Sequence, residues 1–295
     1  MNDATRGGAR SDVARRSPTG LLLSILVAAP VLVGIAYSAA AGAGLVGAGA
    51  GGDGGARFTR VLGDGATWSG VFWSLVVAAI STAAATVGAT LIAVVFRGVR
   101  LADRAGRLLA ALPLPLPHLA AAALGVWVLG QSGLLARIAF ASGMITTPAG
   151  MPALIYDRFG IGLGLTMAWK EAAFLSVVAT ALLATRAREA EETSTTLGAS
   201  HWQTFRRITW PVLWRGLMPA VLSVFIFVAG SYEVAALLAP SAPLALPLAI
   251  AERSADPDLA RRGDAYVLSL LLLGIAVVAM IAHEWTRARW DALGE

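Results

Sequence analysis

Long uncharged apolar runs recur along the 295-residue chain and constrain its fold more than any other feature. About 20 apolar residues in a helix span the roughly 30 Å hydrocarbon core of a bilayer. In lipid, backbone N–H and C=O groups must bond inside the protein, so these runs are expected to be helices. A composition of 57% hydrophobic and 14% charged residues is typical of an integral membrane protein. The sequence therefore predicts an all-α, polytopic membrane protein.

Six runs are predicted to cross the membrane. They cover residues 21–40, 68–96, 108–129, 160–183, 217–238 and 264–282. Prolines 113, 115 and 117 predict that the third span begins as extended or kinked chain. The stretch 138–156 is uncharged but rich in glycine and proline, and another span there would reverse the side of every later loop. It is interpreted as irregular or interfacial structure on the outer face.

The spans divide the chain into four parts. Residues 1–20 are expected to be a disordered cytoplasmic tail, 21–67 the first transmembrane helix with a glycine-rich outer loop, 68–283 the transmembrane core, and 284–295 a second cytoplasmic tail. A secretory signal is the alternative for the first run, because Arg15 and Arg16 precede it and A-x-A sites follow. The later spans and the length of the tail favour an uncleaved helix.

Arginine placement predicts the orientation. Six spans put both termini on one side, and with that side in the cytoplasm fifteen arginines fall in inner segments and seven in outer ones. This distribution follows the positive-inside rule. Because the arginines lie in short patches between spans, they indicate a membrane setting and no nucleic-acid partner.

The longest polar passage between apolar runs, residues 189–211, is named the elbow, and it is predicted to lie in the cytoplasm between the fourth and fifth spans. Gly198 suits a left-handed residue that ends a first short helix. Ser200 and Gln203 form an S-x-x-Q capping box that begins a second one. Pro211 is expected to interrupt the backbone bonding where the next apolar run begins. The pattern indicates a bent element that docks a partner.

The spacing of Glu192, Gly198, Ile208 and Pro211 resembles the EAA loop of permease subunits of binding-protein-dependent ABC importers. A Thr-Ser pair replaces the loop's two alanines and tryptophan replaces the leucine before the proline, whereas the Gly-Ala-Ser continuation is present. A weaker likeness covers residues 68–283. It is closest to the permeases for sulfate, molybdate, thiamine, iron and polyamines.

The resemblance implies a type I importer fold in which the elbow contains the coupling helix. The coupling residues that it implies are Glu192, Gly198, Ala199, Ser200, Ile208 and Pro211. The implied partners are two copies of an ATP-binding subunit, a second permease subunit that is identical or related, an extracytoplasmic solute-binding protein and membrane lipid. The implied location is the inner (cytoplasmic) membrane, and the implied solute is a polyamine, thiamine, iron or a small oxyanion.

The chain is predicted to be a transport subunit and not an enzyme, with no catalytic residue, cofactor or metal. Lys170 is the only lysine, and it lies between Trp169 and Glu171, so no Gly-Lys-Ser/Thr P-loop exists. Three scattered histidines and no cysteine give no metal-ligand cluster. ATP hydrolysis is therefore assigned to a partner subunit.

Ionisable residues inside spans are costly in lipid and indicate function. Lys170 and Glu171 in the fourth span, and Tyr232 and Glu233 in the fifth, are the candidates for lining a solute pathway. Adjacent residues on a helix diverge by about 100°, so Lys170 and Glu171 are expected to have different neighbours.

Two alternative functions stay open. A secondary transporter driven by an ion gradient would show inverted repeats and paired broken helices, and no repeat is evident. A membrane scaffold would have no solvated pathway.

Overall fold

The computed structural model describes residues 18–47 and 49–293. Throughout these residues the regular structure is helical, without strands, which confirms the predicted all-α fold. The helices are α1 (Pro18–Gly42), α2 (Gly54–Gly63), α3 (Gly65–Val95), α4 (Leu101–Ala111), α5 (His118–Leu129), α6 (Leu134–Ala141), α7 (Ile161–Leu182), α8 (Arg188–Thr196), α9 (His201–Thr204), α10 (Trp210–Gly230), α11 (Tyr232–Leu238), α12 (Leu246–Ser254) and α13 (Leu259–Leu293).

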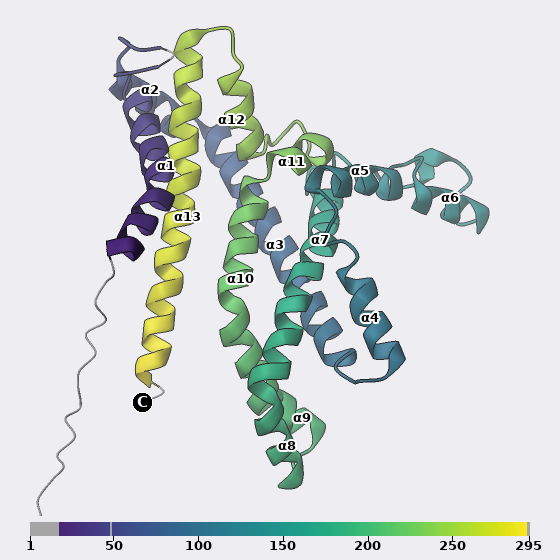
Figure 1. Ribbon diagram of the computed structural model, residues 1–295. Helices are drawn as coiled ribbons and strands as arrows, with labels where there is room; N and C mark the ends of the chain where they lie inside the picture. The colour runs from purple at the N-terminus through teal and green to yellow at the C-terminus, as the bar shows by residue number, and fades with distance from the viewer. Residues whose placement is uncertain (1–17, 48, 294–295) are drawn as a thin grey trace, which may run out of the picture.

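Six helical segments of the described chain are long and apolar enough to cross a membrane, as predicted. They are Leu22–Gly42, Gly65–Val95, His118–Ala141, Ile161–Thr196, His201–Gly230 and Leu259–Trp285. In Figure 1, α3, α7 and α10 pack together in the middle of the molecule, α1 pairs with α13 on one side, and α5 and α6 extend to the other.

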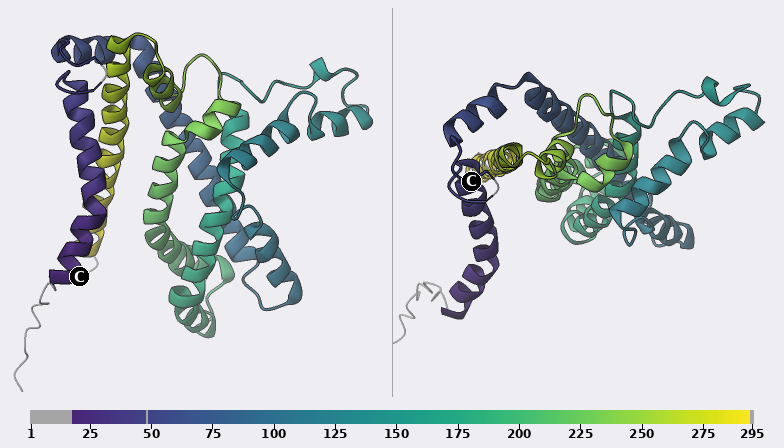
Figure 2. Two further views of the ribbon diagram at one scale, coloured as in Figure 1. Left: turned by 45° about the horizontal axis from the view of Figure 1, so that its top comes forward. Right: turned by 90° about the horizontal axis from the view of Figure 1, so that it is seen from above.

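The two ends of the bundle carry different segments. One end, named the elbow end, holds α8, α9, the α3–α4 connection and the C-terminal part of α13 (Figures 1 and 2). The opposite end holds α2 and α12. The beginning of α1 also points toward the elbow end, because an even number of spans returns the chain to the side on which it began.

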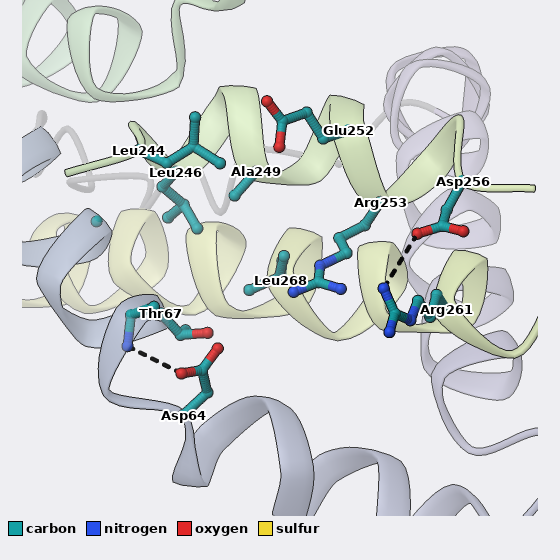
Figure 3. Close-up of a pocket in the computed structure, with 12 residues that line it drawn as sticks. Asp64, Thr67, Leu244, Leu246, Ala249, Glu252, Arg253, Asp256, Arg261 and Leu268 are labelled. Atoms are coloured by element: carbon teal, nitrogen blue, oxygen red, sulfur yellow. Dashed lines mark hydrogen bonds and ion pairs between the residues drawn. The ribbon is translucent and has the colours of Figure 1, made fainter. Parts of the chain in front are cut away.

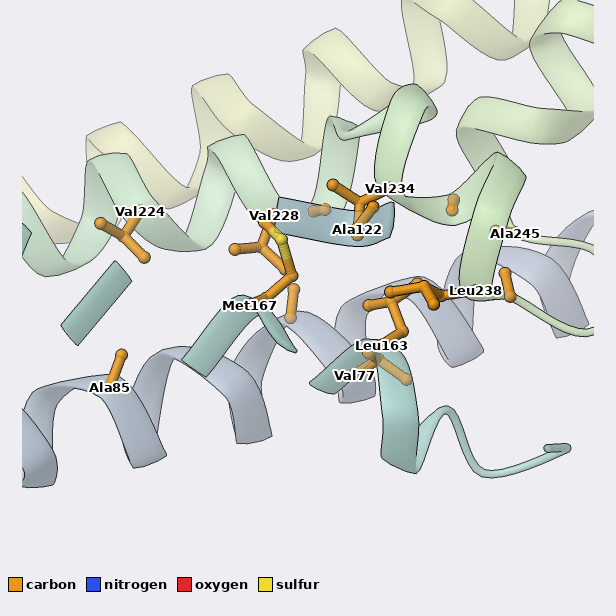
Figure 4. Packing of buried hydrophobic residues seen from close by; sticks show 14 of the residues in the cluster. Val77, Ala85, Ala122, Leu163, Met167, Val224, Val228, Val234, Leu238 and Ala245 are labelled. Atoms are coloured by element: carbon orange, nitrogen blue, oxygen red, sulfur yellow. The ribbon is translucent and has the colours of Figure 1, made fainter. Parts of the chain in front are cut away.

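Small side chains allow α3 and α7 to approach closely. Ala78, Ala85 and Ala89 of α3 are fully buried, as are Met167 and Leu175 of α7. In a membrane, close van der Waals packing holds helices together, since lipid is as apolar as the side chains. Figure 4 shows that residues of α10 and α11 complete the same cluster. The second, fourth and fifth spans therefore share one core.

The start of the third span, predicted over residues 108–129, is broken at its prolines, in agreement with the extended or kinked chain expected there. The three alternating prolines occupy the turn between α4 and α5. A proline removes a backbone donor and its ring clashes with the preceding helical turn, so a helix cannot continue through them. As a result α4 packs separately against α3 and α7, and the segment able to cross the membrane begins only at His118.

The fifth span is also displaced from its predicted position at 217–238. Its helix α10 begins at Trp210 and ends at Gly230, and the backbone turns at Ser231 before α11. Glycine and serine are weak helix formers, so the break falls where the sequence can best accommodate it. Irregular backbone at membrane depth is tolerated where it is buried in protein or lines a water-filled cavity. The α10–α11 break is therefore a candidate part of a pathway.

The other predicted segment boundaries lie closer to those of the structure. Of residues 138–156, which were expected to be irregular or interfacial, the first four form the end of α6, and the others contain only a single 3₁₀ turn, Pro148–Gly150. Helix α13 continues past the predicted boundary at residue 282, where Glu284 and Arg287 form an ion pair of 3.7 Å on one face. The disorder expected for residues 1–20 falls mostly outside the described residues, and α1 begins at Pro18.

A buried arginine joins α1, α2 and α13 at the opposite end. Arg57 is 4% exposed, and it donates hydrogen bonds to the carbonyl oxygens of Ala41 at 2.7 Å and Gly49 at 3.1 Å. Its Nε lies 4.0 Å from Oδ1 of Asp264, which is also buried. Arg60 donates to the same oxygen at 2.6 Å, and this hydrogen bond raises the pKa of Arg60. Asp264 is thus the counter-charge of the junction.

We expect Asp264→Asn to lower the free energy of unfolding by about 3 kcal/mol, because it leaves the buried Arg57 guanidinium without a negative neighbour. Asp256→Asn is the matched control, since Asp256 lies 3.9 Å from a mostly exposed Arg261, and it should cost less than about 1 kcal/mol. Denaturation in detergent micelles measures both. Equal losses would show that the buried junction does not hold α1 and α2 in place.

Candidate functional site

The elbow is a helical hairpin that is continuous with the spans on both sides. Helix α8 follows α7 through a π-helical turn, Leu183–Ala187. Helix α9 leads through a second π-helical turn, Phe205–Thr209, into α10. A π turn inserts an extra residue into a helix and redirects it without breaking it. The hairpin is therefore joined to the fourth and fifth spans without a flexible linker.

The tip of the hairpin has the arrangement expected from the sequence. Gly198 has φ of +82°, and no atom lies within 4 Å of the position a Cβ would take, so backbone conformation alone requires glycine. The N–H of Ala199 donates to the carbonyl oxygen of Ser194 at 3.0 Å, which ends α8 in a Schellman motif. Ser200 Oγ accepts from the Gln203 N–H at 3.3 Å, and Gln203 Oε1 accepts from the Ser200 N–H at 2.9 Å.

A buried carboxylate fixes the hairpin to the bundle. Glu191 is 6% exposed, and its carboxylate accepts hydrogen bonds from the Thr209 hydroxyl and from the Arg97 guanidinium. A second contact joins the hydroxyls of Ser194 and Thr204 at 2.9 Å. Because Arg97 follows α3 and Thr209 precedes α10, one side chain of α8 connects the second, fourth and fifth spans at the elbow end.

Sequence reasoning missed Glu191 and selected its neighbour. The Glu192 side chain is 67% exposed and accepts from Arg188 Nε at 2.9 Å. Two adjacent glutamates on a helix point about 100° apart, so at most one of them can face the bundle. The sequence signal that could have identified Glu191 was this divergence of the two side chains, together with the presence of Thr209 and Arg97 near the same membrane boundary.

The other predicted coupling residues are spread over the hairpin. Gly198, Ala199 and Ser200 form its tip next to Leu197, which is 81% exposed. Ile208 is half-buried and lines a hollow of about 470 Å³ together with Leu197. The same hollow is lined by one acidic and one basic side chain, Glu189 and Arg186, so the surface beside the tip is apolar with charges of both signs.

Pro211 lies apart from the tip, and its predicted interruption of the helix is wrong. It occupies the first turn of α10, where a missing N–H costs least. In the preceding π turn the N–H of Trp210 donates to the carbonyl oxygen of Phe205, five residues earlier. The wider turn changes the hydrogen-bond register just before the proline, so the helix passes through it.

Lys170 and Glu171 are both buried within the bundle, and each has its own partner. Lys170 Nζ donates to the carbonyl oxygen of Leu114 at 3.3 Å, and Glu171 Oε1 lies 3.0 Å from Nε2 of His118. The His118 ring packs against Phe227 with centroids 4.5 Å apart. The two charged side chains therefore secure α7 to the proline turn and to the beginning of α5.

Tyr232 and Glu233 lie on the surface of the chain at the first turn of α11, directly after the break in the fifth span. The Tyr232 side chain is 50% exposed and Glu233 is exposed, whereas the following Val234 is buried in the core. The described residues contain no group of three or more acidic or histidine side chains able to hold a metal ion.

A hollow with charges of both signs lies at the end opposite the elbow (Figure 3). Its volume is about 320 Å³, and its lining includes Asp64, Glu252 and Arg253. Figure 3 shows the Arg253 side chain reaching from α12 toward α13, where Nη1 of Arg261 lies 3.9 Å from Oδ2 of Asp256. The hollow therefore presents both acidic and basic side chains at that end.

Comparisons by family model and by sequence both match the chain to inner membrane transport proteins. The family model described as "Binding-protein-dependent transport system inner membrane component" matches residues 85–291, more than half of the chain. The inner membrane ABC transporter permease protein YnjC of Escherichia coli (strain K12) is 31% identical over 204 residues, which are 68% of this chain and 38% of the relative. The chain thus spans about two fifths of the length of that relative.

Two solved structures share the fold. One is a bacterial ABC transporter involved in the import of the acidic polysaccharide alginate, with a TM-score of 0.68 and 18% identity over 92% of this chain and 93% of the other. The second is a bacterial alginate ABC transporter in complex with an alginate pentasaccharide-bound periplasmic protein, with a TM-score of 0.67 and 17% identity over 89% and 90%. At these identities the likeness concerns the fold alone.

Glu191→Gln should loosen the hairpin, because an amide removes the charge that pairs with Arg97 in a buried setting. We expect amide hydrogen exchange in α8 to accelerate about a hundredfold, which corresponds to roughly 3 kcal/mol. Glu192→Gln, one residue away and exposed, should change the exchange rates less than about threefold. Equal exchange in the two variants would contradict the anchoring role of Glu191.

Proposed function

Because the chain belongs to the family of binding-protein-dependent transport system inner membrane components, we propose that it is the subunit that forms the solute pathway of an ATP-driven importer. It is a multi-pass inner membrane permease of the ABC importer type. In the proposed complex it pairs with a second permease subunit, identical or related, and two copies of an ATP-binding subunit attach to the elbows. A solute-binding protein delivers the solute at the opposite end.

The observation that carries the coupling role is the unbroken helical path from the elbow into two spans. The elbow is linked to α7 and α10 by π turns and to α3 by Glu191. A displacement of the hairpin tip by an ATP-binding subunit would therefore move three spans together. In the proposal Gly198, Ala199 and Ser200 set the angle of the tip, Glu192 contacts the ATP-binding subunit, and Ile208 and Pro211 support the base.

The orientation follows from charge. The proposal places the elbow end and both termini in the cytoplasm, which agrees with the excess of arginines in the segments of that side. The ATP-binding subunits would then lie where ATP is available, and the charged hollow near Arg253 would face the solute-binding protein.

Solute is proposed to pass beside the break between α10 and α11, where the exposed Tyr232 and Glu233 follow Ser231. Rocking of the spans would expose this region to each side of the membrane in turn. Lys170 and Glu171 would position helices around it, because both are buried and already paired. The exposed carboxylate of Glu233 favours a cationic solute, such as a polyamine, thiamine or iron, over a small oxyanion.

Substitution at Gly198 tests the coupling. Gly198→Val should reduce solute uptake by the assembled transporter more than tenfold, because a β-branched residue is strained at φ of +82°. Gly198→Asn should retain most of the uptake, since asparagine tolerates left-handed backbone. Solute uptake is measured for both variants with equal amounts of transporter in the membrane. Full uptake by the valine variant, or uptake driven by an ion gradient without any ATP-binding subunit, would contradict the proposal.

Cysteine labelling tests the pathway, since the native chain has no cysteine. Glu233→Cys should react with a water-soluble maleimide, and the rate should change severalfold when ATP is trapped in the complex. Val234→Cys, whose parent side chain is 1% exposed, is the matched control and should stay unlabelled. A scaffold without a solvated pathway would leave both positions equally unreactive.

A further inference from the structure

A basic hollow at the elbow end takes no part in the proposed transport steps. Its volume is about 510 Å³, and it lies between the π turn after α7, the beginning of α10 and the C-terminal part of α13. Figures 1 and 2 show α13 standing apart from α10 in this region. The hollow is lined by Arg186, Val212, Arg215, Gly216, Met218, Pro219, His283 and Arg287.

This basic hollow, called the groove from here on, carries charge of one sign. Among the side chains that the structure describes, three guanidinium groups line it and no carboxylate does. Within the part of the chain that the structure describes, Arg186 and Arg215 form no ion pair, and Arg287 pairs only with Glu284 on its own helix at 3.7 Å. Arginines at this density repel one another, so the groove is complementary to an anion.

The groove lies at the expected level of the membrane surface. It also has apolar walls. Trp210 and Trp214 stack with ring centroids 5.7 Å apart in a neighbouring hollow that shares Arg215 with the groove, and they indicate the headgroup level because tryptophan is enriched where lipid headgroups meet the hydrocarbon. Deeper along the spans, Met218 and Pro219 line the groove, and Ile281 of α13 is exposed. The basic groups thus lie at headgroup level, with apolar surface on the membrane side of them.

We propose that this groove binds an anionic glycerophospholipid. The phosphate lies against Arg186, Arg215 and Arg287, and the acyl chains follow the apolar surface between α10 and α13. Basic pockets between transmembrane helices at the cytoplasmic side are suited to such headgroups. A free phosphate or another small anion would use the arginines but not the apolar walls, and this distinction favours the lipid.

Native mass spectrometry of the full chain in detergent tests the assignment, with phosphatidylglycerol or phosphatidylcholine added after delipidation. The groove variant is Arg186→Gln, Arg215→Gln and Arg287→Gln combined. The matched control combines Arg104→Gln, Arg206→Gln and Arg207→Gln, which removes three exposed arginines from the same end but outside the groove. If the triple variant does not fold, lipid retention is measured with the single variant Arg215→Gln instead.

The wild-type chain and the control variant should retain phosphatidylglycerol in preference to phosphatidylcholine, and retention should fall about fivefold for each groove arginine removed. Excess inorganic phosphate should not displace the lipid. Equal retention by the two triple variants, equal retention of the two lipids, or displacement by phosphate would overturn the proposal. So would cross-linking of the groove to a second copy of the chain in place of lipid. The measurement requires no transport, so its outcome is independent of the proposed import function.

Discussion

The carboxylate of Glu191 holds together the part of the structure on which everything else depends. It joins α8 to the end of α3 through Arg97 and to the base of α10 through Thr209. An isolated buried charge is strongly unfavourable, so these partners must stay in place as long as the carboxylate is buried. The elbow is thereby a rigid part of the bundle, and a force on its tip is transmitted to the shared core of α3, α7 and α10.

The two ends of the molecule have a feature in common, since a buried acidic side chain paired with arginine joins the helices at each end. At one end Asp264 lies between Arg57 and Arg60, and at the other Glu191 pairs with Arg97. Between them the helices pack through apolar side chains, including alanines that bring them close, and through small buried hydroxyl side chains of α3 and α7 such as Ser81 and Thr166. Such a bundle is free to rock as whole helices, because little directional bonding crosses its middle apart from the pairs made by Lys170 and Glu171.

Much of this architecture could be predicted from the sequence. The number of spans, the position of the elbow, its glycine tip and its capping box all follow from local patterns. Local patterns failed where tertiary contacts decide the outcome. Periodicity alone gave no reason to place the break of the fifth span at Ser231, or to continue the helix through Pro211 by means of a π turn. Burial distinguishes Glu191 from Glu192, and burial depends on how α8 packs against helices that are remote in sequence.

Site-specific cross-linking tests the role of the elbow most directly. Leu197→Cys, at the exposed tip, should be joined to an ATP-binding subunit by a short cross-linker that reacts with a thiol and an amine in the assembled transporter, and the yield should change with bound nucleotide. Ser254→Cys, exposed at the opposite end, should give no such product. Cross-linking of the ATP-binding subunit to residue 254, or no product at residue 197 in an assembled and active complex, would contradict the account.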